Sequence, residues 1–413
     1  MIAARTGDVQ RMARRKDDMA TSVIIVGGGV IGCALAHYLT RSGAEVTLLE
    51  RRRIGQEASW ATAGIITAPL APNVSIARAR LEVASAERYR PLVEELRDIT
   101  GISVEYNPTG ELVVALTDAE AEALHEAIPW QRNLGLPVEW LDGDEARRRE
   151  PALAPAVRGA IWCPVVASLR GQRLTLALAR AAQVGGATII EETPVESLLT
   201  EEHRVVGVRT HVGEFRADAT VIAAGAWSGA LGDAIGLNVP TRPVKGQMLA
   251  LADATPPLRH IVAGGGGYLL PRADGTIAVA ATVDAPGFDI RVTTEGLAWL
   301  SNLVRTVAPA LSTARVIDTW AGLRPDSPDG APLLGRAPGH DNVWIATGHY
   351  PQRHHSGHRS PANCSPAPSV GTIDPRTRPL RPRPLRLTPS LATLPTFANA
   401  LSPRRGRRPL HLH

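Results

Sequence analysis

The chain has 413 residues, of which 44% are hydrophobic, so it can form two domains that each bury a core. No run approaches the roughly 20 apolar residues that a membrane-spanning helix needs, and the first residues contain no apolar core of the kind found in secretion signals. The three cysteines, Cys33, Cys163 and Cys364, show neither paired nor metal-ligand spacing. These features exclude a disulfide scaffold and favour a soluble, cytoplasmic protein with no bound metal and no membrane partner.

The net charge of +5 is unevenly distributed along the chain. Residues 351–413 hold eleven arginines, no lysine and a single acid, Asp374, a net charge of +10 that leaves −5 for residues 1–350. Such a basic segment is typical of a nucleic-acid-binding arm, but no other part of the chain supports that interpretation. We therefore expect no nucleic-acid partner.

Residues 23–50 predict a strand, a helix and a second strand in direct succession. The apolar residues Val23–Val26 are typical of a buried strand, and a helical period then continues to Arg41. A second apolar run, Val46–Leu49, ends in an acid, Glu50. This order is that of the first half of a nucleotide-binding α/β unit.

Between the first strand and the helix, Gly27, Gly29 and Gly32 have the spacing G-x-G-x-x-G. Gly27 permits a tight turn, Gly29 lets backbone N–H groups approach a pyrophosphate, and Gly32 lets the helix pack closely on the strand. The helix N-terminus then faces the phosphates, and Glu50 accepts a hydrogen bond from a ribose hydroxyl. A glycine-rich turn in an ordinary α/β domain is the alternative. The complete series of strand, helix, strand and acid favours a dinucleotide site.

The segments that follow alternate between helical and extended patterns. Helices are predicted over residues 85–98, 118–134 and 169–185. Strands are predicted over residues 104–106, 111–116 and 188–191, with antiparallel strands over 204–224. An Asp274-Gly275 turn joins residues 268–272 to 276–280 in a predicted hairpin.

Parallel units interleaved with antiparallel hairpins predict a mixed α/β fold of two domains, a Rossmann-like dinucleotide-binding domain and a substrate domain built on an antiparallel sheet. The predicted domain boundaries assign residues 1–20 to a disordered extension, 21–95, 145–235 and 325–350 to the dinucleotide-binding domain, 96–144 and 236–324 to the substrate domain, and 351–413 to a disordered tail.

Further motifs occur in a fixed order along the chain: GQEASWATAGII at 55–66, RPVKGQM at 242–248, YLLPR at 268–272 and AGLRPDSPDG at 321–330. Together with the amino-terminal unit, they make residues 21–350 resemble the D-amino-acid oxidase superfamily of FAD enzymes, in particular its glycine oxidase branch, which serves thiamine biosynthesis. The resemblance implies the D-amino-acid oxidase type of fold and a homotetramer.

The resemblance also implies non-covalent FAD, since no cysteine lies near residues 300–350. Carried over residue by residue, the FAD contacts beyond the glycine turn are Val30, Ile31, Glu50, Arg51, Ala58, Ser59, Ala63, Gly64, Ile65, Val195 and His349.

Arg324 of the Gly-Leu-Arg-Pro motif is implied to bind a substrate carboxylate, with Tyr268 beside it. The guanidinium is a planar fork that suits a carboxylate, and a strand end would present it to a cleft. An interdomain ion pair is the alternative for Arg324, and half-buried hairpin packing is the alternative for Tyr268. Lys245 is interpreted as structural or solvated rather than as a Schiff-base nucleophile.

The activity implied by the resemblance is oxidative deamination of glycine or another small amino acid or amine. Hydride passes from the substrate Cα to flavin N5, O₂ is reduced to H₂O₂, and the iminoglycine product supplies thiamine biosynthesis. Orientation of the substrate is the main task of the protein, and no side-chain base is required. A D-amino-acid dehydrogenase with another electron acceptor and an inactive, degenerate flavoprotein stay open as alternatives.

After Tyr350 the sequence departs from the family pattern, which continues Arg-Asn-Gly-Ile-Leu-Leu-Ala-Pro into a closing helix. Residues 351–359 are PQRHHSGHR, and the twelve prolines of 351–413 accompany no apolar period, which predicts disorder. Permitted codons for 351–359, read one base later, encode Arg-Asn-Gly-Ile-Ile-Leu-Ala-Thr. We therefore expect an out-of-frame tail, and weak FAD binding and weak activity for the chain as written.

Overall fold

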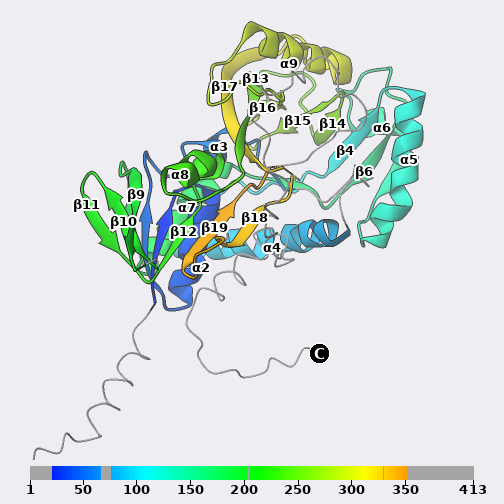
Figure 1. Cartoon of the computed structure of the whole chain (residues 1–413). Coiled ribbons are helices and arrows are strands. Elements are labelled where there is room, and N and C mark those ends of the chain that lie inside the picture. Colours follow the sequence, from blue (N-terminus) through cyan, green and yellow to red (C-terminus); the bar gives the residue numbers. More distant parts are fainter. Residues whose placement is uncertain (1–20, 67–75, 203, 329, 351–413) are drawn as a thin grey trace, which may run out of the picture.

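The computed structural model describes residues 21–66, 76–202, 204–328 and 330–350. The predicted disordered extension (1–20) and out-of-frame tail (351–413) lie outside these residues. Figure 1 shows two main bodies side by side, one around α2 and β12 and the other around β13–β16 and β4. No helix in this described part of the chain combines the length and the apolar character needed to cross a bilayer.

The first body is a six-stranded sheet that is parallel except for one edge strand. In order across the sheet its strands are β18 (Leu333–Arg336), β19 (Val343–Thr347), β12 (Ala219–Ile222), β1 (Ser22–Val26), β2 (Glu45–Leu49) and β8 (Thr188–Ile190). Both faces are covered, which explains why the central strands are continuous apolar runs. The helices packed against it include α2 (Val30–Arg41) and α7 (Gly171–Val184), whose buried residues share a core with β1 and β2.

The second body is an eight-stranded, largely antiparallel sheet. Its order is β17 (Arg315–Asp326), β13 (Arg242–Ala252), β16 (Ile277–Ala280), β15 (Gly267–Pro271), β14 (Ile261–Gly264), β4 (Glu111–Ala115), β6 (Gly159–Cys163) and β5 (Glu139–Asp142). The hairpin predicted around Asp274-Gly275 is confirmed as β15 and β16. On one face, α9 (Thr294–Val307) and α6 (Gly143–Arg149) contribute to a separate core.

The remaining elements connect or flank these two sheets. They are α3 (Ala58–Ala61), β3 (Ile65–Ile66), α4 (Ile76–Thr100), α5 (Asp118–Asn133), β7 (Ala167–Ser168), β9 (Val195–Glu201), β10 (Arg204–Thr210), β11 (Gly213–Arg216), η1 (Gly225–Trp227), α8 (Ser228–Ala234) and η2 (Pro309–Leu311). Strands β9–β11 form a small antiparallel sheet at the edge of the first body (Figure 1).

Three expectations about strands differ from the structure. Residues 104–106 form no strand, because Glu105 has a φ of +55° that interrupts an extended chain; Asn107 makes an isolated bridge to Ser168 instead. Strand β12, expected to be antiparallel, pairs in parallel with β1 and β19, as its fully buried apolar run requires. Strand β6 lies inside the segment 145–235 expected in the dinucleotide-binding domain, but it pairs with β4 and β5 of the other sheet.

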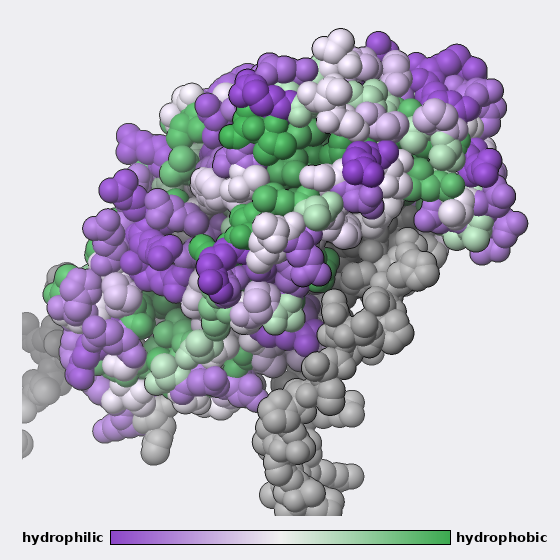
Figure 2. Space-filling model, turned by 90° about the horizontal axis from the view of Figure 1, so that it is seen from above, coloured by the Kyte–Doolittle hydropathy of each residue, from purple (hydrophilic) through white to green (hydrophobic). Residues whose placement is uncertain are grey.

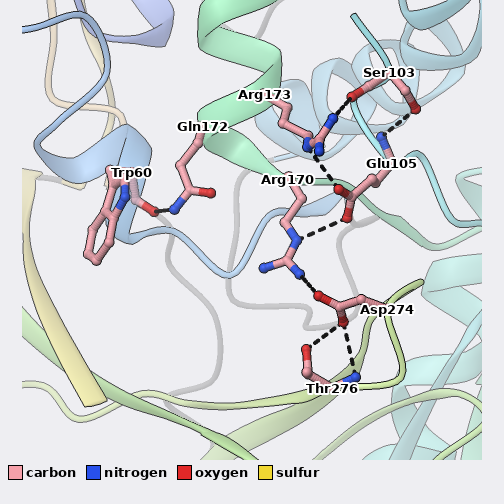
Figure 3. A network of polar contacts seen from close by, with 8 residues as sticks. All are labelled: Trp60, Ser103, Glu105, Arg170, Gln172, Arg173, Asp274 and Thr276. Atoms are coloured by element: carbon pink, nitrogen blue, oxygen red, sulfur yellow. Dashed lines mark hydrogen bonds and ion pairs between the residues drawn. The ribbon is translucent and has the colours of Figure 1, made fainter. Parts of the chain in front are cut away.

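A cluster of charged residues joins α7 to the hairpin of the second sheet (Figure 3). Arg170, just before α7, donates from Nε to Glu105 at 3.0 Å and forms an ion pair with Asp274 in the β15–β16 turn. Arg173 binds the other oxygen of Glu105 at 2.8 Å. Since Arg170 and Glu105 are three-quarters buried, this cluster helps to hold the two sheets in a fixed relation.

Candidate active site

A cavity of about 600 Å³ lies between the carboxyl ends of β1 and β2 and one face of the eight-stranded sheet. Most residues predicted for the site line it: Gly27, Gly29, Val30, Ile31, Glu50, Arg51, Ala58, Ser59, Ala63, Val195, Tyr268, Arg324 and His349. The fold therefore gathers residues from both sheets around one space, as expected where helices and strands of an α/β sheet leave a crevice.

Three predicted residues, Gly32, Gly64 and Ile65, are not among those that line the cavity. A Cβ on Gly32 would overlap the carbonyl oxygen of Gly27, so the close packing of helix on turn depends on this glycine. Gly64 has a φ of +82°, and a Cβ there would overlap the carbonyl of Leu169. Ile65 belongs to β3 and pairs with Ser168.

The start of α2 is suited to an anion. Its N-cap, Gly29, offers no side-chain cap, and the first turn contains no acid. Gly27 has a φ of +113°, and a Cβ on it would lie 2.8 Å from the carbonyl carbon of Ala223. The hydroxyl of Ser59 accepts from the N–H of Val30 at 2.9 Å. Backbone N–H groups at a helix start, together with glycines that allow close approach, match the needs of a pyrophosphate.

Glu50 lies at the end of β2 and is only 7% exposed. Its carboxylate accepts from the N–H of Gly28 at 2.6 Å and from the N–H of Arg52 at 2.9 Å. A carboxylate has about four acceptor positions, so these two bonds orient it and leave capacity for ribose hydroxyls. The position and chemistry of Glu50 therefore fit the nucleotide half of FAD.

A stack of three side chains, Arg51, Trp227 and Phe288, lies beside this half of the cavity. The Arg51 guanidinium is 3.8 Å from the ring centroid of Trp227 and also pairs with Glu57. On the second body, Phe288 approaches Trp227 with 5.5 Å between ring centroids. Sequence reasoning missed Trp227, because its placement follows from the parallel pairing of β12, which had been expected to be antiparallel.

From the eight-stranded sheet, Arg324 on β17 and Tyr268 on β15 both line the cavity. The Nη1 of Arg324 donates to the carbonyl of Thr282 at 3.0 Å. Its guanidinium also hydrogen-bonds the hydroxyl of Tyr350, where burial raises the pKa of the phenol and the nearby Arg324 charge acts in the opposite direction. Arg324 forms no ion pair with another described residue, and it is one of the residues that line the cavity.

Lys245 lies on the same strand, β13, as the cavity residues Gly246 and Met248, but it is not one of the residues that line the cavity. It is 3% exposed and its Nζ donates to the carbonyl of Arg291 at 3.1 Å. This placement agrees with a structural role for the lysine.

His349 follows β19 and lines the cavity. Its Nε2 is buried and has no hydrogen-bond partner among the described residues. Burial lowers the pKa of His349 to about 4, so the imidazole is neutral near pH 7. An orphaned buried nitrogen in a cavity indicates a place for a ligand atom. Elsewhere in the described chain no group of acids, histidines and cysteines could hold a metal.

Comparison with known proteins agrees with this geometry. The sequence matches the family described as FAD dependent oxidoreductase (DAO) over residues 22–358. It is 38% identical over 334 residues to glycine oxidase of Pseudomonas aeruginosa, which covers 80% of this chain and 90% of the relative. A bifunctional ThiO/ThiG protein of Synechocystis is 35% identical over 80% of this chain, a match that spans 49% of that longer protein.

The crystal structure of glycine oxidase from Geobacillus kaustophilus matches with a TM-score of 0.76 and 34% identity, covering 80% of this chain and 90% of that one. The mixed α/β fold expected from the sequence is thereby confirmed. The chain therefore belongs to the FAD dependent oxidoreductase (DAO) family.

Proposed function

We propose that this protein oxidises glycine, or another small amino acid or amine, with FAD as cofactor and O₂ as electron acceptor. Glycine and O₂ then give the imine of glyoxylate and H₂O₂. The observation that carries the proposal is one cavity lined both by the glycine turn and Glu50 of the first body and by Arg324 and Tyr268 of the second. The glycine oxidase and ThiO/ThiG relatives support an imine product destined for thiamine biosynthesis.

In this proposal the glycine turn and the start of α2 bind the FAD pyrophosphate, and Glu50 binds the adenosine ribose. Other residues that line the cavity complete the cofactor site: Val30, Ile31, Arg51, Ala58, Ser59, Ala63, Val195 and His349. When bound, FAD supplies the acceptor for the two electrons lost from the substrate.

The substrate carboxylate binds the guanidinium of Arg324. Because the Thr282 carbonyl and the Tyr350 hydroxyl already hold that guanidinium, its remaining N–H groups have a fixed direction. Tyr268 lies beside the carboxylate and limits its rotation. The surrounding Met248 and Leu323 are apolar and exclude water from the reacting carbon. The contribution of the protein is orientation rather than proton transfer by a side-chain base.

We further propose a cytoplasmic location and a homotetramer. Cys33 and Cys163, the two cysteines in the described part of the chain, are both buried, which suits a reducing compartment.

The test uses the full chain purified with excess FAD. Stoichiometric flavin absorbance, and peroxide release on adding glycine under air, would support the proposal. Turnover that requires a dye acceptor under nitrogen would instead support the dehydrogenase alternative. Protein that binds flavin but oxidises neither glycine nor D-alanine, in the chain as written and in a version with the frame restored after Tyr350, would contradict it.

A further inference from the structure

The side chain of Arg324 lies directly on a glycine of the neighbouring strand. Strands β13 and β17 pair in antiparallel register, with Val244 opposite Arg324 and Gly246 opposite Gly322. A Cβ built on Gly246 would lie 2.5 Å from Cζ and 2.8 Å from Nη1 of Arg324, closer than side chains approach. The guanidinium therefore occupies the space that any side chain at position 246 would take.

The backbone at this position does not itself require glycine. Gly246 is absent from the described glycines with positive φ, and it lies inside a regular ladder of strand pairs. Glycine in a strand interior weakens the strand by entropy and lost packing, so its presence indicates the close approach of another group. Here that group is the guanidinium of Arg324, which lines the cavity.

Together, three contacts determine the position of the guanidinium. The Thr282 carbonyl and the Tyr350 hydroxyl bind its N–H groups, and Gly246 allows it to lie against the strand. A planar fork binds a carboxylate well only when its N–H groups are aligned with both oxygens.

We propose that Gly246 is a positioning residue for carboxylate binding, acting through Arg324; the inference rests on the proposed role of Arg324. A methyl group at position 246 displaces the guanidinium and weakens binding of the carboxylate, whereas the cofactor end of the cavity is unchanged.

The test compares Gly246→Ala with a matched control, Gly264→Ala. Gly264 lies on β14 of the same sheet, also without positive φ, and a Cβ there would overlap a side-chain methyl of Val114 and lie 3.2 Å from the Val114 carbonyl oxygen, away from the cavity. Acetate, a carboxylate without an amine, is titrated into the FAD-loaded full chain, and the shift in flavin absorbance gives its Kd.

We expect Gly246→Ala to weaken acetate binding and to raise the KM for glycine about 10- to 100-fold, with an FAD Kd within about twofold of the parent value. Gly264→Ala should lower Tm without changing the acetate Kd. If Arg324→Ala weakens acetate binding but the acetate Kd of Gly246→Ala stays within about twofold of the parent value, the positioning role of Gly246 alone is overturned. An unchanged acetate Kd in Arg324→Ala overturns the proposed anchor itself.

The double variant Gly246→Ala with Arg324→Ala gives a second, independent measurement. Without the guanidinium the new methyl has room, so the double variant should match Arg324→Ala in both Tm and acetate Kd. A further loss of Tm in the double variant would indicate a role for Gly246 in the strand itself and would contradict the inference.

Discussion

The two sides of the cavity offer a ligand opposite kinds of chemical group. On the cofactor side, the Glu50 carboxylate accepts from the N–H of Gly28 in the glycine turn and from the N–H of Arg52, and the start of α2 carries no acid or side-chain cap. At the substrate end, a backbone carbonyl holds the Arg324 guanidinium, which itself faces the cavity. The first arrangement is built within one short segment, whereas the second needs three strands in correct register.

This difference predicts which binding event a substitution on each side should affect. Changes in the glycine turn should weaken cofactor binding, and they should also lower stability where the glycine packs directly against backbone, as Gly32 does. Changes around Arg324 should weaken substrate binding and leave cofactor binding unchanged. Apolar residues also reach the surface between hydrophilic ones on the face seen in Figure 2. Phe288 is itself 46% exposed, and it links the two bodies through its contact with Trp227.

The largest effect is expected within the glycine turn, where two substitutions should differ in kind. Gly32→Ala forces a Cβ onto the Gly27 carbonyl, so we expect a Tm lower by several degrees together with loss of FAD binding. Gly29→Ala has room, since its Cβ would lie 3.4 Å from the Ser59 hydroxyl. It should keep the parent Tm and yet weaken FAD about 100-fold by blocking the pyrophosphate. Thermal unfolding and flavin titration measure both, and a parent-like Tm for Gly32→Ala would contradict the packing role.

At the substrate end, Arg324→Ala should raise the KM for glycine about 10- to 200-fold, the usual effect of losing a hydrogen bond to a charged group. Tyr268→Phe removes a single hydroxyl and should raise the KM for glycine about fivefold. The FAD Kd should not change in either variant. Steady-state kinetics and flavin titration provide the data, and equal loss of FAD and glycine binding would show that the two ends are not separable.

The neutral state of His349 predicts a pH dependence. Its pKa is lowered from 6.5 to about 4 in the folded protein, so between these values the unfolded chain binds the proton more readily. Its contribution to stability is complete above pH 6.5 and is lost as the pH falls towards 4, at up to about 1.4 kcal/mol per pH unit.

His349→Gln cannot titrate in this range, so its free energy of unfolding should fall less between pH 7 and pH 5 than that of the parent. Urea unfolding at both pH values measures the difference. Parallel losses in the two proteins would rule out the histidine as the source.

The smallest effect is expected at the stack that joins the two bodies. Phe288→Ala removes the aromatic contact with Trp227, worth about 0.5–1.5 kcal/mol, and should weaken FAD binding by a factor of about two to ten. Ile290 is exposed to a similar degree in the same loop, 48% against 46% for Phe288, so Ile290→Ala is a matched control. Equal FAD affinities for the two variants would show that the stack does not affect the cofactor site.

Much of the fold could be predicted from local patterns. The strand–turn–helix–strand series to Glu50 was confirmed within a residue at each end, because apolar periodicity and glycine spacing act within one segment. The prediction of a strand at 104–106 was wrong because Glu105 has a positive φ, which an apolar pattern does not reveal.

The sequence by itself determined the cofactor class, since backbone recognition of a pyrophosphate is encoded in consecutive positions. Only the tertiary structure decided that β12 runs parallel to β1, which brings Trp227 to the cavity, and that Gly246 lies under Arg324. The physical reason is that contacts between side chains of distant segments depend on strand register. A shift of one residue in a strand would turn every side chain to the other face.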